Sequence, residues 1–242
     1  MRFTAILAAI FALSPQAWAC EAPDDDGLLY HSCDPAAALL LLPEDAGAPD
    51  LANDELLVTG GYTATDARDD GRPKPVGLFA SEGRIASREY VRFDGVLTIA
   101  EGRPRLHYRR RVKFLGRNWD LEDRADRSGF LAAAETSGAS LLQSHLLIID
   151  GAVDTAPVSG APVFRRRILF QKGDAVGVWD SGADALTLDE AAREVARRFA
   201  PDMALNLDMG SYDFCQRGAV RCGALRYAQT GKLSYMLRFS LR

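Results

Sequence analysis

Asp208 is the carboxylate whose position in the sequence best suits chemistry. It ends the apolar segment Met203-Ala204-Leu205-Asn206-Leu207-Asp208 and precedes Met209-Gly210-Ser211. A carboxylate at the end of a strand can stabilise a developing positive charge or activate water, and ligand sites gather at such strand ends in layered α/β structures. An aspartate before a turn can instead cap that turn. The sequence alone leaves both roles open.

Basic residues and histidines supply fewer signals. The cluster Arg165-Arg166-Arg167 has the charge to bind a phosphate, although a solvated strand end is the ordinary explanation for such a run. His145 has either a catalytic or a structural role, and neither His31 nor His107 has an evident partner. The chain contains no Gly-rich phosphate loop, no Ser-His-Asp order and no H-E-x-x-H motif.

Four cysteines, Cys20, Cys33, Cys215 and Cys222, suggest two disulfides in an oxidising compartment. Three pairings exist, of which Cys20–Cys33 with Cys215–Cys222 closes the shortest loops. Zinc binding is disfavoured because the chain has no C-x2-C spacing. The absence of a C-x-x-C motif also argues against a redox enzyme. We expect no metal and no cofactor.

The first residues indicate export. Met1–Ala19 has a positive start, a short apolar stretch and a small-x-small ending, as in a cleaved signal peptide. Cys20 directly follows the expected cut, which leaves a lipid-anchored protein as the alternative; Ala17 and the bulky Trp18 favour a soluble mature protein in the periplasm or secreted. No later apolar run is long enough to span a membrane.

Length and charge exclude other classes. With 242 residues the chain can bury a substantial core, and its net charge of −4 gives no electrostatic footprint for nucleic acid. We expect a single α+β domain over residues 20–242, rich in strands, with a mixed sheet and one well-marked helix at about 188–200.

The elements that must position Asp208 have local signals. Thr187 and Glu190 form a capping box, and the following residues carry an apolar face at helical spacing up to Pro201. Short strands are expected around two hairpins, which turn at Glu82-Gly83 and Glu101-Gly102, and in four further apolar runs. These four runs are residues 56–58, 146–149, 176–179 and 235–241.

Four motifs in order resemble the phosphodiester glycosidase family, between residues 56 and 211. The first is an apolar strand followed by Thr59-Gly60-Gly61-Tyr62 and later by Pro75-Val76-Gly77-Leu78. The second and third are similar to Gln143-Ser144-His145-Leu146 and to the run from Arg165 to Phe170, in which Arg166 aligns best. The fourth resembles Ala204-Leu205-Asn206-Leu207-Asp208 with Gly210.

The resemblance implies a hydrolase that cleaves a sugar 1-phosphodiester in an envelope glycan. The leaving group is a phosphate monoester with a second pKa of about 6, which departs without strong proton assistance. Such a site needs a phosphate ligand and a carboxylate beside the sugar. The resemblance assigns catalysis to Asp208 and substrate binding to ten further residues, namely Gly60, Gly61, Tyr62, Gln143, Ser144, Arg165, Arg166, Asn206, Gly210 and Ser211.

Four positions depart from the family pattern. Thr59 replaces an asparagine, His145-Leu146 replaces Gly-Pro, and Met209 replaces a glycine. Each change adds bulk or removes an amide where a backbone approaches closely. These departures favour the alternative function, a non-catalytic carbohydrate-binding or envelope scaffold protein with the same fold, whereas the intact Asp208 favours the enzyme.

Overall fold

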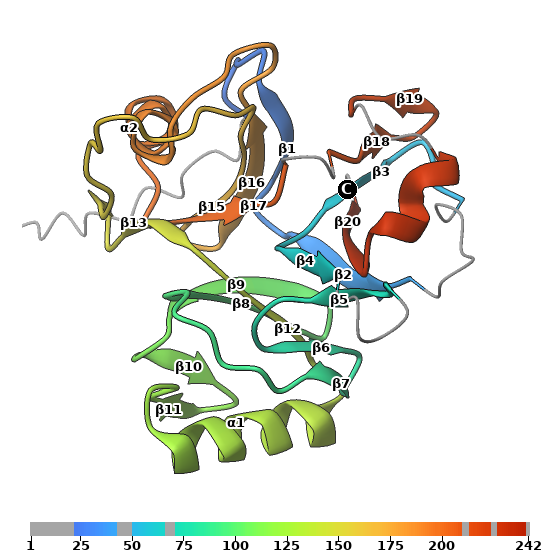
Figure 1. Ribbon diagram of the computed structural model, residues 1–242, viewed down its shortest axis with the longest axis vertical. Helices are drawn as coiled ribbons and strands as arrows, with labels where there is room; N and C mark the ends of the chain where they lie inside the picture. The colour runs from blue at the N-terminus through green and yellow to red at the C-terminus, as the bar shows by residue number, and fades with distance from the viewer. Residues whose placement is uncertain (1–21, 43–49, 66–70, 210–212, 224–226, 241–242) are drawn as a thin grey trace, which may run out of the picture.

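The computed structural model describes residues 22–42, 50–65, 71–209, 213–223 and 227–240 (Figure 1). The predicted signal peptide and three residues with predicted roles, Cys20, Gly210 and Ser211, lie outside these ranges. The described chain is rich in strands and contains two α-helices.

Three antiparallel sheets make up most of the fold. The sheet that carries Asp208 at the end of one strand, called the β17 sheet here, has six strands in the order β1 (Leu28–Ser32), β16 (Ala175–Asp180), β15 (Arg167–Lys172), β17 (Met203–Leu207), β13 (Leu146–Ile149) and β14 (Ala152–Val153). In Figure 1 it lies in the upper half of the view, beside α2, which is at the upper left.

The other two sheets have five strands each. The β12 sheet has the order β7 (Arg84–Ser87), β6 (Phe79–Ser81), β12 (Ser140–Ser144), β8 (Gly95–Ala100) and β9 (Arg103–Tyr108). The β3 sheet has the order β19 (Val220–Arg221), β18 (Cys215–Arg217), β3 (Glu55–Thr59), β20 (Tyr235–Ser240) and β2 (Ala36–Leu41). The short elements outside these sheets are the pairs β4 (Thr63–Thr65) with β5 (Pro73–Pro75) and β10 (Val112–Phe114) with β11 (Arg117–Trp119), and a 3-10 helix at Tyr227–Lys232.

The prediction of a mixed sheet is wrong for the described strands, because every strand pair among them is antiparallel. Tight turns explain part of this arrangement. Both predicted hairpins form, and both residues of the Glu82-Gly83 and Glu101-Gly102 turns have positive φ. Leu115-Gly116 and Asp150-Gly151 close two further hairpins in the same way. A two-residue turn of this kind joins only antiparallel neighbours.

The predicted helix is α2 (Leu188–Phe199), and its capping box forms as expected. The Thr187 side chain accepts from the Glu190 amide, and the Glu190 carboxylate accepts from the Thr187 amide. The sequence reasoning missed α1 (Arg124–Ser137), which is capped by Asp123 and ends at the left-handed Gly138. Gly129 and several charged residues in its first turns interrupt the apolar pattern of α1, so its periodicity is much weaker than that of α2.

The core lies where the inner faces of the three sheets meet. Leu205 of β17, Val58 of β3 and Leu142 of β12 are buried together in the largest hydrophobic cluster. Smaller clusters bury α1 against the outer face of the β12 sheet and α2 against the outer face of the β17 sheet. Because side chains alternate along a strand, Ala204 of β17 faces α2 while Leu205 faces the core.

The cysteines agree in part with the prediction. Cys215 and Cys222 form a disulfide, and Cys33 is also disulfide-bonded. In the described part of the chain, neither α-helix is long and apolar enough to cross a membrane. No cluster of three or more metal-binding side chains occurs among the described residues.

Two turn glycines provide a matched test of this fold. A Cβ at Gly83 would lie 2.7 Å from the Glu135 carbonyl oxygen, whereas a Cβ at Gly116 would meet nothing within 4 Å. Both have positive φ, so either change to alanine should cost about 1–2 kcal/mol of conformational strain. Gly83→Ala should lose at least about 1 kcal/mol more, because packing β7 against α1 leaves no room for the methyl group. Urea unfolding of both variants measures the difference, and equal losses would contradict this close approach.

Candidate active site

The strand β17 delivers two polar side chains to the outer face of its sheet. It pairs with β15 on one side and with β13 on the other. Asn206 lies on the same face as Ala204, and Asp208 follows two residues later. The Asp208 amide donates to the Gly60 carbonyl at 2.8 Å, which brings the end of β3 against the end of β17. The segment Gly60-Gly61-Tyr62 therefore reaches the carboxyl end of the central strand.

Arg166 and Asp208 flank the end of the ladder between β15 and β17. Arg167 pairs with Leu207 and Ile168 with Asn206, so Arg166 and Asp208 are the next residues beyond the last pair. Both line the same cavity, and among the described residues no ion pair joins them. Its guanidinium is held by two backbone carbonyls: Nε donates to Leu186 at 2.8 Å and Nη2 to Pro162 at 3.1 Å. The side chain is 8% exposed. Burial lowers the pKa of Arg166, but an arginine remains charged at any ordinary pH.

Tyr62 and Asn206 complete the polar group. Asn206 Nδ2 donates to the Tyr62 hydroxyl at 2.8 Å. Burial, and secondly the negative charge of Asp208, raise the pKa of Tyr62 to about 12, so its hydroxyl keeps its proton. Asn206 is 2% exposed, and its Oδ1 has no hydrogen-bond partner among the described residues. A buried acceptor without a partner is costly unless a water or ligand satisfies it.

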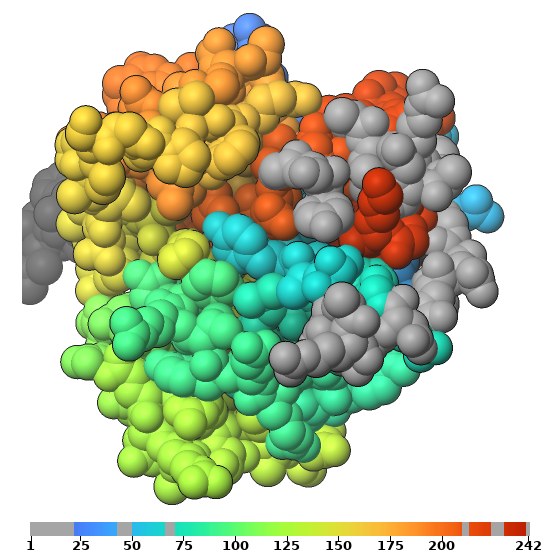
Figure 2. Space-filling model, in the orientation of Figure 1, coloured from blue at the N-terminus to red at the C-terminus, as the bar shows by residue number. Residues whose placement is uncertain are grey.

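These side chains converge on one cavity of about 620 Å³. Its walls come from the end of β17, the start of α2, the residue after Gly61 and the segment before β15. The lining residues are Tyr62, Thr155, Ala156, Val158, Ala161, Pro162, Phe164, Arg166, Thr187, Leu188, Asp189, Asn206, Asp208 and Met209. In Figure 2 the segment before β15 is gold and the chain after β3 is cyan.

The environment of Asp208 changes its acidity. Burial raises the pKa of the Asp208 carboxyl to about 6, although hydrogen bonds from the backbone amides of Thr63 and Met209 act in the opposite direction. The carboxylate is therefore mainly ionised at neutral pH but takes up a proton within the range in which enzymes work. Such a perturbed group in a cavity is typical of a functional site.

Two predicted site residues, Gln143 and Ser144, have structural contacts and do not line this cavity. Gln143 is fully buried; its Oε1 accepts from the Leu78 amide, and its Nε2 donates to the carbonyls of Val91 and Phe93. The Ser144 hydroxyl donates to the Asn206 carbonyl at 2.6 Å. Ser144 thus supports the strand that carries Asn206.

Gly60 and Gly61 are required by the close approach of Tyr235. A Cβ at Gly60 would lie 2.4 Å from the Tyr235 ring, and one at Gly61 would lie 2.6 Å from its hydroxyl. Of the pair, the Gly60 carbonyl takes the Asp208 amide, as described above. The two glycines therefore position Asp208 and Tyr62, and neither lines the cavity.

Arg165 points away from the cavity. It forms ion pairs with Asp213 at 3.1 Å and with Asp180 at 3.8 Å, and its Nε donates to the Gly182 carbonyl. Arg167 joins the same two aspartates at 3.0 and 2.7 Å and is fully buried. The alternation of strand side chains thus separates Arg166 from its two neighbours.

The four departures from the family pattern have different surroundings. Thr59 is buried and accepts from the Phe214 amide at 2.9 Å, and Leu146 belongs to the core. The His145 ring packs edge-on against Phe93 at 4.4 Å between centroids, and burial lowers its pKa. Of the four, only Met209 lines the cavity.

Sequence reasoning missed the residues that α2 and the segment before it add to the cavity. Asp189, in the first turn of α2, accepts from Thr155 Oγ1 at 3.0 Å and pairs with Arg193 at 2.9 Å. The capping box located the start of α2, but no sequence signal showed that this start faces Asp208. The segment from Thr155 to Phe164 has no periodic pattern, so the sequence did not predict that it lines the cavity.

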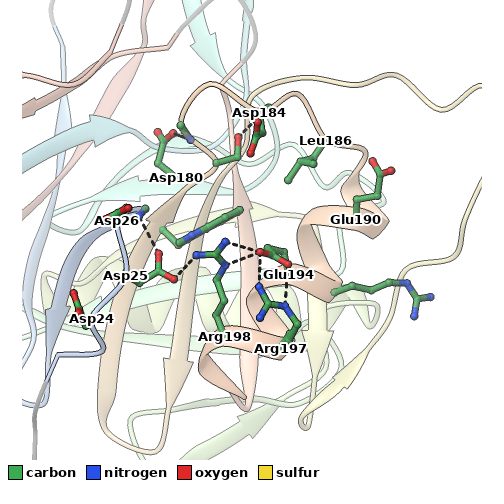
Figure 3. Close-up of a pocket in the computed structure, with 15 residues that line it drawn as sticks. Asp24, Asp25, Asp26, Asp180, Asp184, Leu186, Glu190, Glu194, Arg197 and Arg198 are labelled. Carbon is green, nitrogen blue, oxygen red and sulfur yellow. Dashed lines mark hydrogen bonds and ion pairs between the residues drawn. The ribbon is translucent and has the colours of Figure 1, made fainter.

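A second, larger cavity of about 850 Å³ lies on the other side of α2 (Figure 3). Figure 3 shows Arg198 between Asp25 and Glu194, and Arg197 also binds Glu194. The arginines of this second cavity thus form ion pairs with neighbouring carboxylates. Arg193 forms its ion pair with Asp189, which lines the first cavity, and so connects the walls of the two cavities.

The fold is similar to solved structures. It matches the catalytic domain of zebrafish N-acetylglucosamine-1-phosphodiester alpha-N-acetylglucosaminidase, auto-inhibited by its pro-peptide, with a TM-score of 0.50, 12% identity and coverage of 86% of this chain and 73% of that chain. It also matches a putative exported protein from Burkholderia pseudomallei, with a TM-score of 0.55, 13% identity and coverage of 85% and 71%. No protein-family model matches the chain, and no curated protein matches it by sequence.

At these identities the similarity establishes a shared fold. The fold, the Cys215–Cys222 disulfide and the likeness to an exported protein are consistent with a periplasmic or secreted location.

The raised pKa of Asp208 predicts a measurable effect on stability. Folding raises this pKa from 3.8 to about 6, so the folded protein binds the proton more tightly than the unfolded chain. The wild type should therefore lose about 1–3 kcal/mol as pH rises from about 4 to above 6, and Asp208→Asn should not show this loss. Urea unfolding of both proteins at pH 4.5 and 7.5 measures the difference.

Asp54→Asn, which removes an exposed carboxylate, controls for net charge. A difference between wild type and Asp208→Asn that does not change with pH would contradict the desolvation of Asp208.

Proposed function

We propose that this chain is an exported hydrolase that cleaves the glycosyl–phosphate bond of a sugar 1-phosphodiester. The observation that carries the proposal is the convergence of Asp208, Arg166, Asn206 and Tyr62 on one cavity. The shared fold with a glycosyl phosphodiester hydrolase supports the same class of reaction. An envelope glycan is the substrate source that fits an exported protein.

In this proposal Arg166 binds the phosphate group of the substrate. Two backbone carbonyls fix its guanidinium, and none of the described residues accepts a hydrogen bond from its Nη1. A fixed guanidinium can offer its remaining N–H groups to the phosphate oxygens. Arg165, which the sequence offered as an alternative, is occupied by Asp213 and Asp180.

Asn206 and Tyr62 are placed to orient the sugar. The Asn206 Oδ1 is an unused acceptor, so a sugar hydroxyl can donate to it. The Tyr62 hydroxyl accepts from Asn206, which leaves its own proton for an oxygen of the substrate. Because Asn206 is buried and the half-buried Tyr62 is hydrogen-bonded to it, both groups would be well oriented before substrate enters.

Asp208 supplies the negative charge that the transition state needs. In the hydrolysis, the oxygen of water bonds to the anomeric carbon while the bond from that carbon to the phosphate oxygen breaks, and its electron pair leaves with the phosphate monoester. The Asp208 carboxylate either takes the proton of the attacking water or stabilises the oxocarbenium-like sugar. The leaving phosphate needs no acid partner, since its second pKa is about 6.

A non-catalytic carbohydrate-binding or envelope scaffold protein is the second candidate. It is favoured by the structural use of Gln143, Ser144 and Gly60, which leaves fewer groups for the substrate than the sequence suggested. Binding of a sugar 1-phosphodiester without any turnover would select this function.

Replacing Asp208 tests the enzyme directly. Asp208→Asn keeps the shape and removes the charge, so hydrolysis of a chromogenic sugar 1-phosphodiester should fall at least about a hundredfold. Asp202→Asn is the matched control, because Asp202 precedes the same strand at its other end and accepts from the Gly173 amide. Equal turnover by wild type and Asp208→Asn would remove Asp208 from catalysis.

The pKa of Asp208 also sets the expected pH dependence. If the ionised carboxylate acts, kcat/KM should fall as pH decreases through about 6, approaching a tenfold loss for each pH unit. A pH–rate profile from pH 4.5 to 8 with the folded fraction monitored by circular dichroism measures it. A flat profile across this range would exclude the ionised form as the reacting species.

A further inference from the structure

The mouth of the Asp208 cavity is apolar in a way that the reaction itself does not require. Five large hydrophobic residues are exposed in the described part of the chain, and three of them, Val158, Val163 and Phe164, lie on the short segment before β15. Val158 is 67% exposed and Phe164 48% exposed, and both line the cavity. In Figure 2 this gold segment lies on the visible surface.

The apolar residues lie directly beside Arg166, the residue proposed to bind the phosphate. The guanidinium carbon of Arg166 is 5.3 Å from the centre of the Phe164 ring. Ala161 and Pro162 belong to the same wall. A ligand held by Arg166 would therefore have its sugar near Asp208 and Asn206 and its other substituent against apolar side chains.

Hydrogen bonds at both ends fix this wall. Thr155 Oγ1 donates to Asp189 at 3.0 Å, and Phe164 exchanges two backbone hydrogen bonds with Leu186 at 3.1 and 2.8 Å. Between them, the Pro162 carbonyl accepts from Arg166. The Val158 carbonyl also accepts from the Ala161 amide at 3.1 Å, so backbone hydrogen bonds hold both Val158 and Phe164 at the mouth of the cavity.

We propose that the ester group on the far side of the phosphate is aliphatic and packs against Val158 and Phe164. This inference rests on the proposed function and narrows its substrate to an aliphatic ester of a sugar 1-phosphate. A second sugar at this place would leave the apolar wall in contact with polar groups, whereas an alkyl chain removes it from water. Arg166 neutralises the one charge that the diester carries.

Binding of an ester series tests this wall without needing turnover. Calorimetry with the Asp208→Asn protein would compare methyl, butyl and octyl esters of one sugar 1-phosphate. Affinity should rise about two- to fourfold for each methylene that reaches the wall. Val158→Ser and Phe164→Ser should flatten this rise while binding of the methyl ester persists, which also shows that the variants fold.

Val163→Ser is the matched control, since Val163 is 53% exposed on the same segment but does not line the cavity. Affinity that is independent of chain length, or lost equally in all three variants, overturns the aliphatic wall. If affinity depends on the length of the alkyl chain but the wild type hydrolyses none of the esters, the aliphatic wall is supported and the proposed function is refuted. A hexadecyl ester held in phosphatidylcholine vesicles separates the sources: co-sedimentation indicates a membrane lipid, and binding of the monomeric esters alone indicates a soluble one.

Discussion

The hydrogen bond between the Asp208 amide and the Gly60 carbonyl joins the β17 sheet to the β3 sheet at the candidate site. Three antiparallel sheets share one core, so the chain must pass from sheet to sheet at strand ends. One such passage follows β3 and another leads from β12 to β13 through His145. Both passages meet the carboxyl end of β17: the first through the Gly60 carbonyl, and the second through the His145 carbonyl, which accepts from the Asn206 amide at 2.9 Å. Gly60 and Gly61 leave room for Tyr235 beside the first passage. The site is built where these passages meet.

Burial changes the acidity of Asp208 and also makes its ionised form costly for the stability of the fold. The loss of hydration that raises its pKa to about 6 is unfavourable for the ionised form. Only two backbone amides compensate it, whereas the buried carboxylates of Asp180 and Asp213 have arginine partners. A structural carboxylate would be expected to find a cation in the same way. The absence of one at Asp208 among the described residues fits a group that is reserved for a ligand.

Local signals in the sequence predicted the elements near the site well, because they depend on a few adjacent residues. The capping box fixed the start of α2, and the Glu82-Gly83 and Glu101-Gly102 pairs fixed two hairpins. The sheet type and α1 were not predicted, since strand pairing is set by long-range contacts and α1 has weak periodicity. Motif order singled out Asp208, Asn206, Tyr62 and Arg166, which line one cavity. It also singled out Gln143 and Ser144, which do not line this cavity and whose backbone partners depend on how the sheets assemble.

Alternation along β15 and the residues before it explains why one arginine of three lines the cavity of Asp208. Arg167 faces inward, where Asp180 and Asp213 hold its charge and Phe214 accepts from its Nη1 at 3.0 Å. Arg166 faces outward, where its guanidinium donates to two neutral carbonyls and forms no ion pair with the described residues. A guanidinium paired with carboxylates has little attraction left for a phosphate, but one bound to carbonyls keeps its full charge. The same backbone therefore produces a structural ion pair on one face and, on the other, the cation that the proposed function assigns to an anionic ligand.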